Sequence, residues 1–243
     1  NALPHACADL DEIHWQRASH AILTTDTHAK LASRVVSVSG SEVTLTGMAK
    51  GAGMIRPDMA TMLAFVATDA EISSVFLDRL FRQAVSASFN RITVDGDTST
   101  NDAAMMAATG CSGIAIEAEG AEAVAAFTQA LESLCLELAQ AIIRDGEGAT
   151  KFVEVQVDGG ADADECDAIA YTIAHSPLVK TALFASDPNW GRLLAAIGRA
   201  GLKNLCVEDV SLYLNDVLIA VNGARAPEYT EAQGQVAMAP TEL

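Results

Sequence analysis

Basic and aromatic residues are scarce in this sequence. Only 15 of its 243 residues are Lys or Arg, against 32 Asp or Glu, so the formal net charge is −17. A nucleic-acid surface needs clustered Lys and Arg to displace counterions from phosphates, so we expect no nucleic-acid partner. Aromatic residues make up 5% of the chain while 50% of it is hydrophobic, which leaves Ala, Val, Leu and Ile to fill a sizeable core.

Sequence signals for a metal site and for membrane insertion are missing as well. Neither Cys-x-x-Cys nor His-x-x-x-His occurs, so we expect no metal site and no cofactor. Five dispersed cysteines are typical of buried thiols in a reducing compartment, which favours a cytoplasmic location. No apolar run reaches membrane-spanning length and no signal-peptide pattern opens the chain, so we expect no membrane partner. The chain begins with Asn1, which favours a processed chain or a piece of a longer one.

The hydrophobic periodicity predicts a mixture of helices and strands. Helices are predicted at residues 5–20, 74–89, 121–144 and 162–174, with another beginning at an Asp187 cap and Pro188. Strands are predicted at 34–38, 42–45, 61–68, 92–94, 151–157 and 178–185, and strands should dominate after Val207. The run 61–68 is apolar enough to be buried on both faces. We therefore expect an α/β or α+β layered fold, with mixed sheets sandwiched with helices.

A glycine-rich loop, predicted over residues 47–60, ends directly before Thr61. Threonine is common in strands, so Thr61 can be an ordinary packed strand residue. The alternative is chemical. If the bond between Ala60 and Thr61 breaks, Thr61 gains a free α-amine beside its own hydroxyl. Such an amine titrates at about 7.7–8.0, so near neutral pH it can act as the general base for that hydroxyl.

Four segments carry a family resemblance: AILTTD (21–26), KGAGMIRPDMATMLAFVATDA (50–70), DGDTSTND (95–102) and LVKTALFASDPNWGR (178–192). In this order and spacing they resemble the ornithine acetyltransferase family, also called glutamate N-acetyltransferase. The segment 50–70 resembles that family's self-cleavage junction. The resemblance implies an N-terminal-nucleophile-like, self-cleaving enzyme of arginine biosynthesis, cut between Ala60 and Thr61.

The implied reaction moves an acetyl group from N-acetylornithine to glutamate by a ping-pong route through acetyl-Thr61, and some family members also accept acetyl-CoA. No metal or redox cofactor is implied. Residues 1–60 would end the first, alpha subunit, and residues 61–243 would form most of the second, beta subunit. Two chains of each are expected in a heterotetramer. The family's preceding segment, with its oxyanion-hole groups, and its C-terminal tail with a substrate-binding Asn and Ser or Thr lie outside these 243 residues.

The resemblance also implies three substrate-binding residues beside Thr61. Thr24 matches a substrate-binding threonine, although a turn or capping role is the simpler interpretation. Lys50 matches a lysine that could pair with the substrate carboxylate, although most lysines are solvated. Glu147 matches a glutamate that could bind the ornithine amine or steady the Thr61 amine, although it could be one more solvated acid.

Other polar residues are predicted to be structural. The cluster of Asp95, Asp97, Asn101 and Asp102 could suggest a hard-cation site, but turn formation in support of the active site is the preferred interpretation. Asp187 and Asn189 are predicted to be capping and scaffold residues. Two other functions remain open: an N-terminal-nucleophile aminopeptidase or hydrolase, and a non-catalytic amino-acid-binding module.

Overall fold

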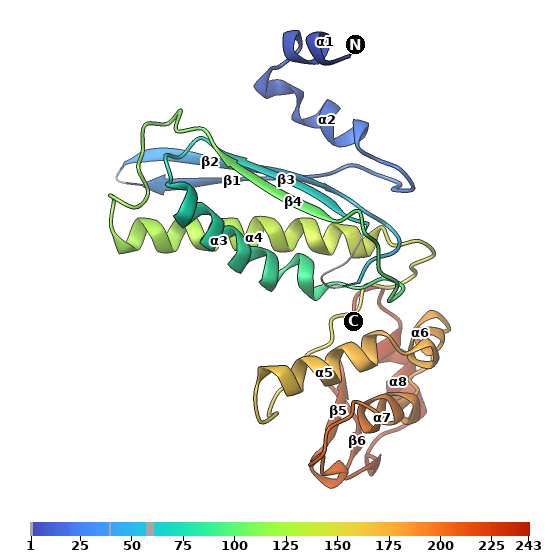
Figure 1. Ribbon diagram of the computed structural model, residues 1–243. Helices are drawn as coiled ribbons and strands as arrows, with labels where there is room; N and C mark the ends of the chain where they lie inside the picture. Colours follow the sequence, from blue (N-terminus) through green and yellow to red (C-terminus); the bar gives the residue numbers. More distant parts are fainter. Residues whose placement is uncertain (1, 39, 57–60) are drawn as a thin grey trace. The chain divides into compact units, whose positions relative to one another are not determined.

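The computed structural model describes residues 2–38, 40–56 and 61–243, and the chain divides into two compact units. Unit 1 is Asn1–Glu147 and unit 2 is Gly148–Leu243 (Figure 1). The predicted subunit boundary between residues 60 and 61 falls inside unit 1. The division into alpha and beta subunits remains a prediction.

Unit 1 is built on a four-stranded mixed sheet. The β1–β2 hairpin turns at Gly40, whose φ of 84° suits glycine, and its strands include the two predicted at 34–38 and 42–45. β2 also pairs antiparallel with β3, whereas β3 and β4 are parallel. The strand order is β1-β2-β3-β4, with bounds Lys30–Val38, Ser41–Lys50, Leu63–Thr68 and Ala103–Ala108.

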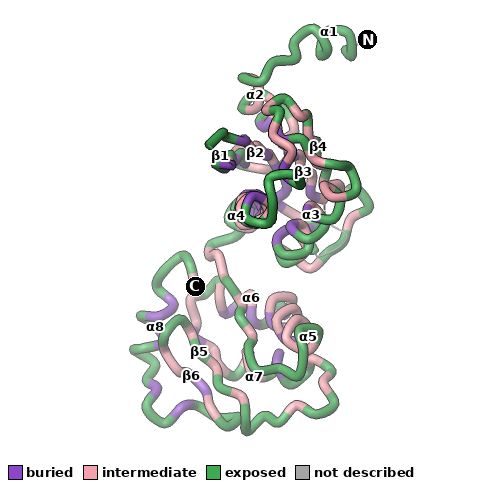
Figure 2. The backbone as a smooth tube through the Cα atoms, turned by 90° about the vertical axis from the view of Figure 1, so that its left-hand side faces the viewer, coloured by how far each residue is buried: buried purple, intermediate pink, exposed green. Residues whose placement is uncertain are grey.

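Helices α3 (Ser74–Ala87) and α4 (Ala121–Arg144) cover one face of this sheet. Both helices confirm predicted ones, and Ser73 caps α3 by accepting a hydrogen bond from Phe76 N–H. Figure 2 shows buried residues on α4. Phe127 is the one aromatic residue among them, so mainly aliphatic side chains fill this part of the core. The helix approaches β2 closely at Gly47, where a Cβ would lie 2.8 Å from Leu134 Cδ2.

The opposite face of the sheet carries an apolar row in register across all four strands, formed by Leu31, Met48, Phe65 and Met105. Helix α2 (Trp15–Ala21) contacts β1 and β2, yet Leu31 and Met105 are 40% and 55% exposed. The prediction that residues 61–68 are buried on both faces is therefore wrong for the described part of the chain. An apolar sequence indicates which residues can be buried, but not whether a second layer covers them.

Unit 2 combines four helices with a small antiparallel sheet. α5 confirms the predicted helix at 162–174, with Asp162 as its cap, and strands do follow Val207. The sheet order is β5-β6-β7. The helices are α5 (Ala163–Ala174), α6 (Pro177–Phe184), α7 (Trp190–Gly198) and α8 (Glu231–Met238), and the strands are Ser211–Leu214, Val217–Val221 and Ala224–Arg225.

Three predicted strands are wrong. Residues 178–185 are mostly the helix α6, because Ser176 caps its first turn and Pro177 is compatible with the first helical position. Residues 151–157 form only a bridge at Phe152, whose N–H donates to Thr241. Residues 92–94 follow a 3₁₀ turn (η2, Phe89–Arg91), and Val94 N–H donates to the glycine loop at Ile55. Strand β4 was missed because its sequence, AAMMAA, has little β propensity.

Smaller corrections concern element ends and the cysteines. Residues 5–20 form two helices, α1 (Leu3–Ala8) and α2, separated by the 3₁₀ turn η1 (Glu12–His14). The cap of α7 is Asn189 rather than Asp187. Strand β2 continues to residue 50, so the loop predicted at 47–60 begins later. All five cysteines are free thiols, but only Cys135 is buried, so the expectation of buried thiols is mostly wrong.

Burial raises the pKa of the Cys135 thiol to about 12, with a smaller contribution from Glu132, so this thiol is neutral near pH 7. Within the described residues, no helix combines the length and the apolar character needed to cross a membrane.

We expect Leu134→Ala to lower the free energy of unfolding of unit 1 by about 2–5 kcal/mol, because it leaves a cavity where α4 packs on the sheet at Gly47. Leu136→Ala is the matched control, since this leucine lies two positions away on α4 and is 45% exposed. It should change stability by less than about 0.5 kcal/mol. Urea unfolding followed by circular dichroism measures both, and equal losses would contradict the packing described here.

Candidate active site

The glycine loop that follows β2 is held in place by Asp95. The Asp95 carboxylate accepts hydrogen bonds from Met54 N–H at 2.7 Å and Ile55 N–H at 3.2 Å. The same carboxylate accepts from Asp97 N–H at 3.0 Å, as in a turn. The predicted turn-forming role is confirmed for Asp95, while the assignment of this loop to the active site stays a prediction.

Thr61 lies in a bend two residues before β3, so the prediction that it begins the strand is wrong. Its N–H donates to Met54 O at 2.8 Å, which fixes it against the glycine loop. Thr61 is half-buried, and its hydroxyl oxygen is buried without a hydrogen bond to any described residue. Ala60, the other residue of the predicted cleavage site, lies outside the described residues.

Lys50 is a buried lysine, not a solvated one. It ends β2, is 7% exposed, and its Nζ donates to Thr61 O at 3.2 Å. The register explains this contact, because Lys50 pairs with Leu63 in the β2–β3 ladder. The ammonium therefore lies beside the backbone of the predicted nucleophile.

Glu147 meets the same loop from the C-terminal end of α4. Its N–H donates to Ala52 O at 2.8 Å. Its carboxylate lies against Gly53, where a Cβ would be 3.0 Å from Glu147 Cδ. Glu147 is exposed, so its charge remains available to a ligand. Glu147 and Thr61 thus both bind the backbone of one short loop, at Ala52 O and Met54 O respectively.

Thr24 is exposed and is connected to the loop through Asp26. Thr24 N–H donates to Asp26 Oδ2 at 3.2 Å, while Asp26 Oδ1 accepts from Gly51 N–H at 2.7 Å. The turn containing Thr24 is therefore fixed to the residue that follows Lys50. Both interpretations of Thr24, as a turn residue and as a ligand contact, are compatible with this position.

A buried ion cluster, which the sequence analysis missed, lies behind the loop. Lys30 Nζ donates to Asp26 Oδ1 and to Asp145 Oδ2, each at 2.6 Å, and all three side chains are at most 2% exposed. Asp145 also accepts hydrogen bonds from the N–H and the hydroxyl of Thr27. One signal was available in the sequence, because Lys30 lies an even number of residues before the apolar Ala32, Val36 and Val38. In a strand it therefore shares their buried face.

The electrostatics of this cluster keep both aspartates ionised. Burial by itself raises the pKa of Asp26, but the hydrogen bond from Lys30 and backbone N–H donors outweigh it and hold the pKa below its ordinary value. The pKa of Asp145 is likewise lowered, because Lys30 and Thr27 outweigh the effect of burial. The cluster is therefore a fixed arrangement of charges at neutral pH.

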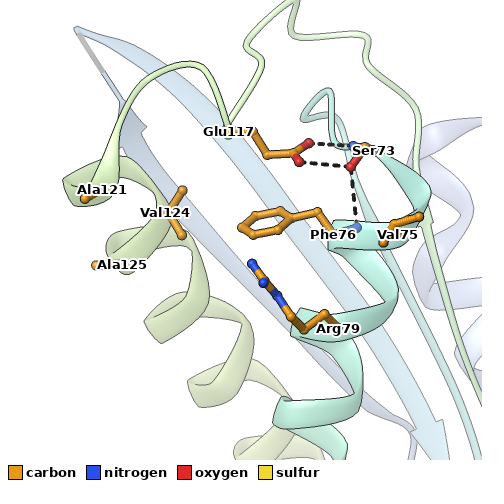
Figure 3. Close-up of a pocket in the computed structure, with 8 residues that line it drawn as sticks. All are labelled: Ser73, Val75, Phe76, Arg79, Glu117, Ala121, Val124 and Ala125. Carbon is orange, nitrogen blue, oxygen red and sulfur yellow. Dashed lines mark hydrogen bonds between the residues drawn. The ribbon is translucent and has the colours of Figure 1, made fainter.

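A separate pocket of about 660 Å³ lies between the N-terminal halves of α3 and α4 (Figure 3). Its Ser73 hydroxyl donates to Glu117 at 2.9 Å while capping α3, and the Arg79 guanidinium lies 4.6 Å from the Phe76 ring centre. None of the four predicted site residues lines this pocket. Its one hydroxyl–carboxylate pair, Ser73 with Glu117, is engaged in capping α3, since Ser73 accepts from Phe76 N–H and Glu117 also accepts from Ser73 N–H. The glycine loop is therefore the stronger candidate.

Two further expectations concern unit 2 and metals. Asn189 accepts from Arg192 N–H at 3.1 Å and donates to Asp187 at 3.0 Å, which confirms scaffold roles for both. Across residues 2–38, 40–56 and 61–243, no group of three His, Cys, Asp or Glu side chains is placed to hold a metal ion.

Comparison with known proteins identifies the family of the chain. The ArgJ family model matches residues 1–243. The chain is 54% identical to the Arginine biosynthesis bifunctional protein ArgJ of Pseudomonas fluorescens (strain Pf0-1), and 52% identical to that of Pseudomonas syringae pv. tomato (strain ATCC BAA-871 / DC3000). Both matches cover 100% of this chain but 60% of the relative, so the chain spans only part of their length.

A solved structure of an ArgJ protein also matches this chain. The Arginine biosynthesis bifunctional protein argJ of Bacillus halodurans is 36% identical, with a TM-score of 0.67, and the match covers 73% of this chain and 84% of that one. This likeness confirms the predicted fold class of mixed sheets and helices, of the N-terminal-nucleophile type. Because the family model spans every residue, this chain belongs to the ArgJ family.

Proposed function

We propose that this chain forms the central part of an acetyltransferase of arginine biosynthesis, which moves an acetyl group from N-acetylornithine to glutamate. Cleavage between Ala60 and Thr61 would free the Thr61 α-amine. The observation that supports this most directly is the Thr61 hydroxyl, which is buried and lacks a hydrogen bond to any described residue. The backbone carbonyl of the same residue accepts a hydrogen bond from Lys50. No described residue competes with a substrate for this hydroxyl.

The reaction would proceed in two steps. The α-amine takes the hydroxyl proton while Thr61 Oγ1 attacks the acetyl carbonyl. The bond from the carbonyl carbon to the ornithine nitrogen then breaks, and the α-ammonium returns its proton to that nitrogen. Next, the amine of glutamate attacks the acetyl-threonine ester. This second step releases N-acetylglutamate and restores the Thr61 hydroxyl.

The charges around the loop suit an amino-acid substrate. The Lys50 ammonium can pair with the substrate α-carboxylate, and the exposed Glu147 carboxylate can bind the side-chain ammonium of ornithine. Lys50 reaches the backbone of Thr61, and Glu147 lies against Gly53 on the same loop. A substrate held between these opposite charges would have its ends oriented relative to the nucleophile.

Two alternatives remain distinguishable by experiment. An N-terminal-nucleophile hydrolase would share the self-cleavage and pass the acyl group to water, so loss of the acetyl group would not need glutamate. An amino-acid-binding module would bind ornithine in calorimetry without turnover. Use of acetyl-CoA as a second donor and assembly into a heterotetramer are further parts of the proposal.

In the full-length protein, we expect denaturing mass spectrometry to find two fragments, the second beginning at Thr61. Thr61→Ala should remain a single chain and lose acetyl transfer by at least about a thousandfold, because it lacks the nucleophile. Thr61→Ser is the control, since it keeps a hydroxyl beside the new amine and should still cleave. Acetyl transfer by uncleaved Thr61→Ala would refute the mechanism.

We also expect Glu147→Gln to raise the KM for N-acetylornithine about 10- to 100-fold, because a charge-assisted hydrogen bond contributes roughly 1.5–3 kcal/mol. Glu122→Gln removes the same charge from an exposed position in the first turn of α4 and should leave KM within about twofold. Steady-state kinetics with varied N-acetylornithine measure both. Equal values for the two variants would exclude Glu147 as a substrate ligand.

A further inference from the structure

We infer that Lys30 is a positioning residue for the proposed acetyl transfer, because it joins the three segments that carry Thr24, Lys50 and Glu147. The inference rests on the proposed function, since it concerns how that site is held in shape. Lys30 itself is 2% exposed and its ammonium donates to Asp26, His28 and Asp145, so it acts through these residues rather than by touching the reacting atoms.

The Lys30 ammonium donates to three acceptors. Two are carboxylates, Asp26 and Asp145, each 2.6 Å away, and the third is His28 O at 3.4 Å. Lys30 has three N–H donors, so this set uses its whole donor capacity. The two aspartates belong to segments separated by more than a hundred residues, and the lysine between them removes their mutual repulsion.

Each aspartate extends the connection to a different part of the site. Asp26 accepts from Gly51 N–H at 2.7 Å and from Thr24 N–H at 3.2 Å, so it joins the Thr24 turn to the residue after Lys50. Asp145 is the C-terminal cap residue of α4 and precedes Glu147 by two positions. The position of Asp145 therefore sets where the backbone of Glu147 meets the loop at Ala52.

A second cation on the same strand provides a comparison. Arg34 also joins β1 to α4, through Ser133 and Glu137, but its ion pair is 30% and 52% exposed. Arg34 donates to Ser33, Ser133 and Glu137, and none of these three is a predicted site residue. Substitution of Arg34 therefore measures the effect of losing a contact between β1 and α4 that does not involve the glycine loop. Substitution of Lys30 measures the loss of a contact that does.

The test uses the full-length protein with Lys30→Met and, as a matched control, Arg34→Met. We expect Lys30→Met to raise the KM for N-acetylornithine at least about tenfold, because small displacements of binding groups are costly, with kcat reduced by less than about threefold. Arg34→Met should lower the melting temperature but leave KM within about twofold of wild type. A raised KM with a nearly unchanged kcat distinguishes positioning of the binding groups from a general loss of stability.

A milder variant covers the case in which Lys30→Met does not fold. Asp26→Asn keeps an oxygen acceptor for Gly51 N–H but removes the charge that faces Lys30, and we expect it to raise KM by about fivefold or more. If the folded variants of Lys30 and Asp26 keep KM within about twofold of wild type, the positioning role is overturned. It is also overturned if Arg34→Met raises KM as much.

Failure of the proposed function gives a different result. In that case wild-type protein would not transfer acetyl from N-acetylornithine to glutamate, or Thr61→Ala would remain active. Calorimetry with N-acetylornithine then decides the inference separately. A dissociation constant at least about tenfold higher for Lys30→Met than for wild type supports it, and equal constants or an absence of binding to wild type overturn it.

Discussion

Antiparallel pairing of β2 with β3 is the constraint on which the candidate site depends. The last pair of this ladder is Lys50 with Leu63, so the glycine loop leaves and re-enters the sheet at one place. Thr61 therefore lies beside Lys50, although eleven residues separate them in sequence. The flanking strands remain joined through the sheet whether or not the bond before Thr61 is intact. Cleavage there would create a new N-terminus without releasing either flank.

Two carboxylates hold the described part of the glycine loop, one exposed (Asp95) and one buried (Asp26). Asp95 holds Met54 and Ile55 from one side, and Asp26 holds Gly51 from the other. Each contact uses a carboxylate to satisfy backbone N–H groups that no strand partner satisfies. The site proposed to bind a charged amino acid would thus rest on charges already fixed within the protein, which would avoid reorganisation when the substrate arrives.

The sequence predicted features that depend on local periodicity, and missed those that depend on tertiary contacts. Apolar residues recur at helical spacing throughout residues 121–144, and so many turns of one pattern were sufficient to place α4. The same reasoning predicted a strand at 178–185, because a short, mostly apolar segment does not distinguish a strand from a buried helix by periodicity. Only Ser176 and Pro177 mark it as a helix. Lys30 was missed because a lysine in a strand is normally solvated, and its two carboxylate partners lie in other segments.

Thr61 shows why the chemical interpretation is preferable to the structural one. A packed strand residue would lie within β3 and satisfy its hydroxyl, but Thr61 precedes the strand and its hydroxyl is unpaired among described residues. Leaving a buried hydroxyl unsatisfied costs about 1–3 kcal/mol. Valine has nearly the same shape and would avoid that cost, so stability alone does not account for threonine here. The proposed reaction of this hydroxyl with an acyl group would account for it, because a strong internal hydrogen bond would compete with the substrate.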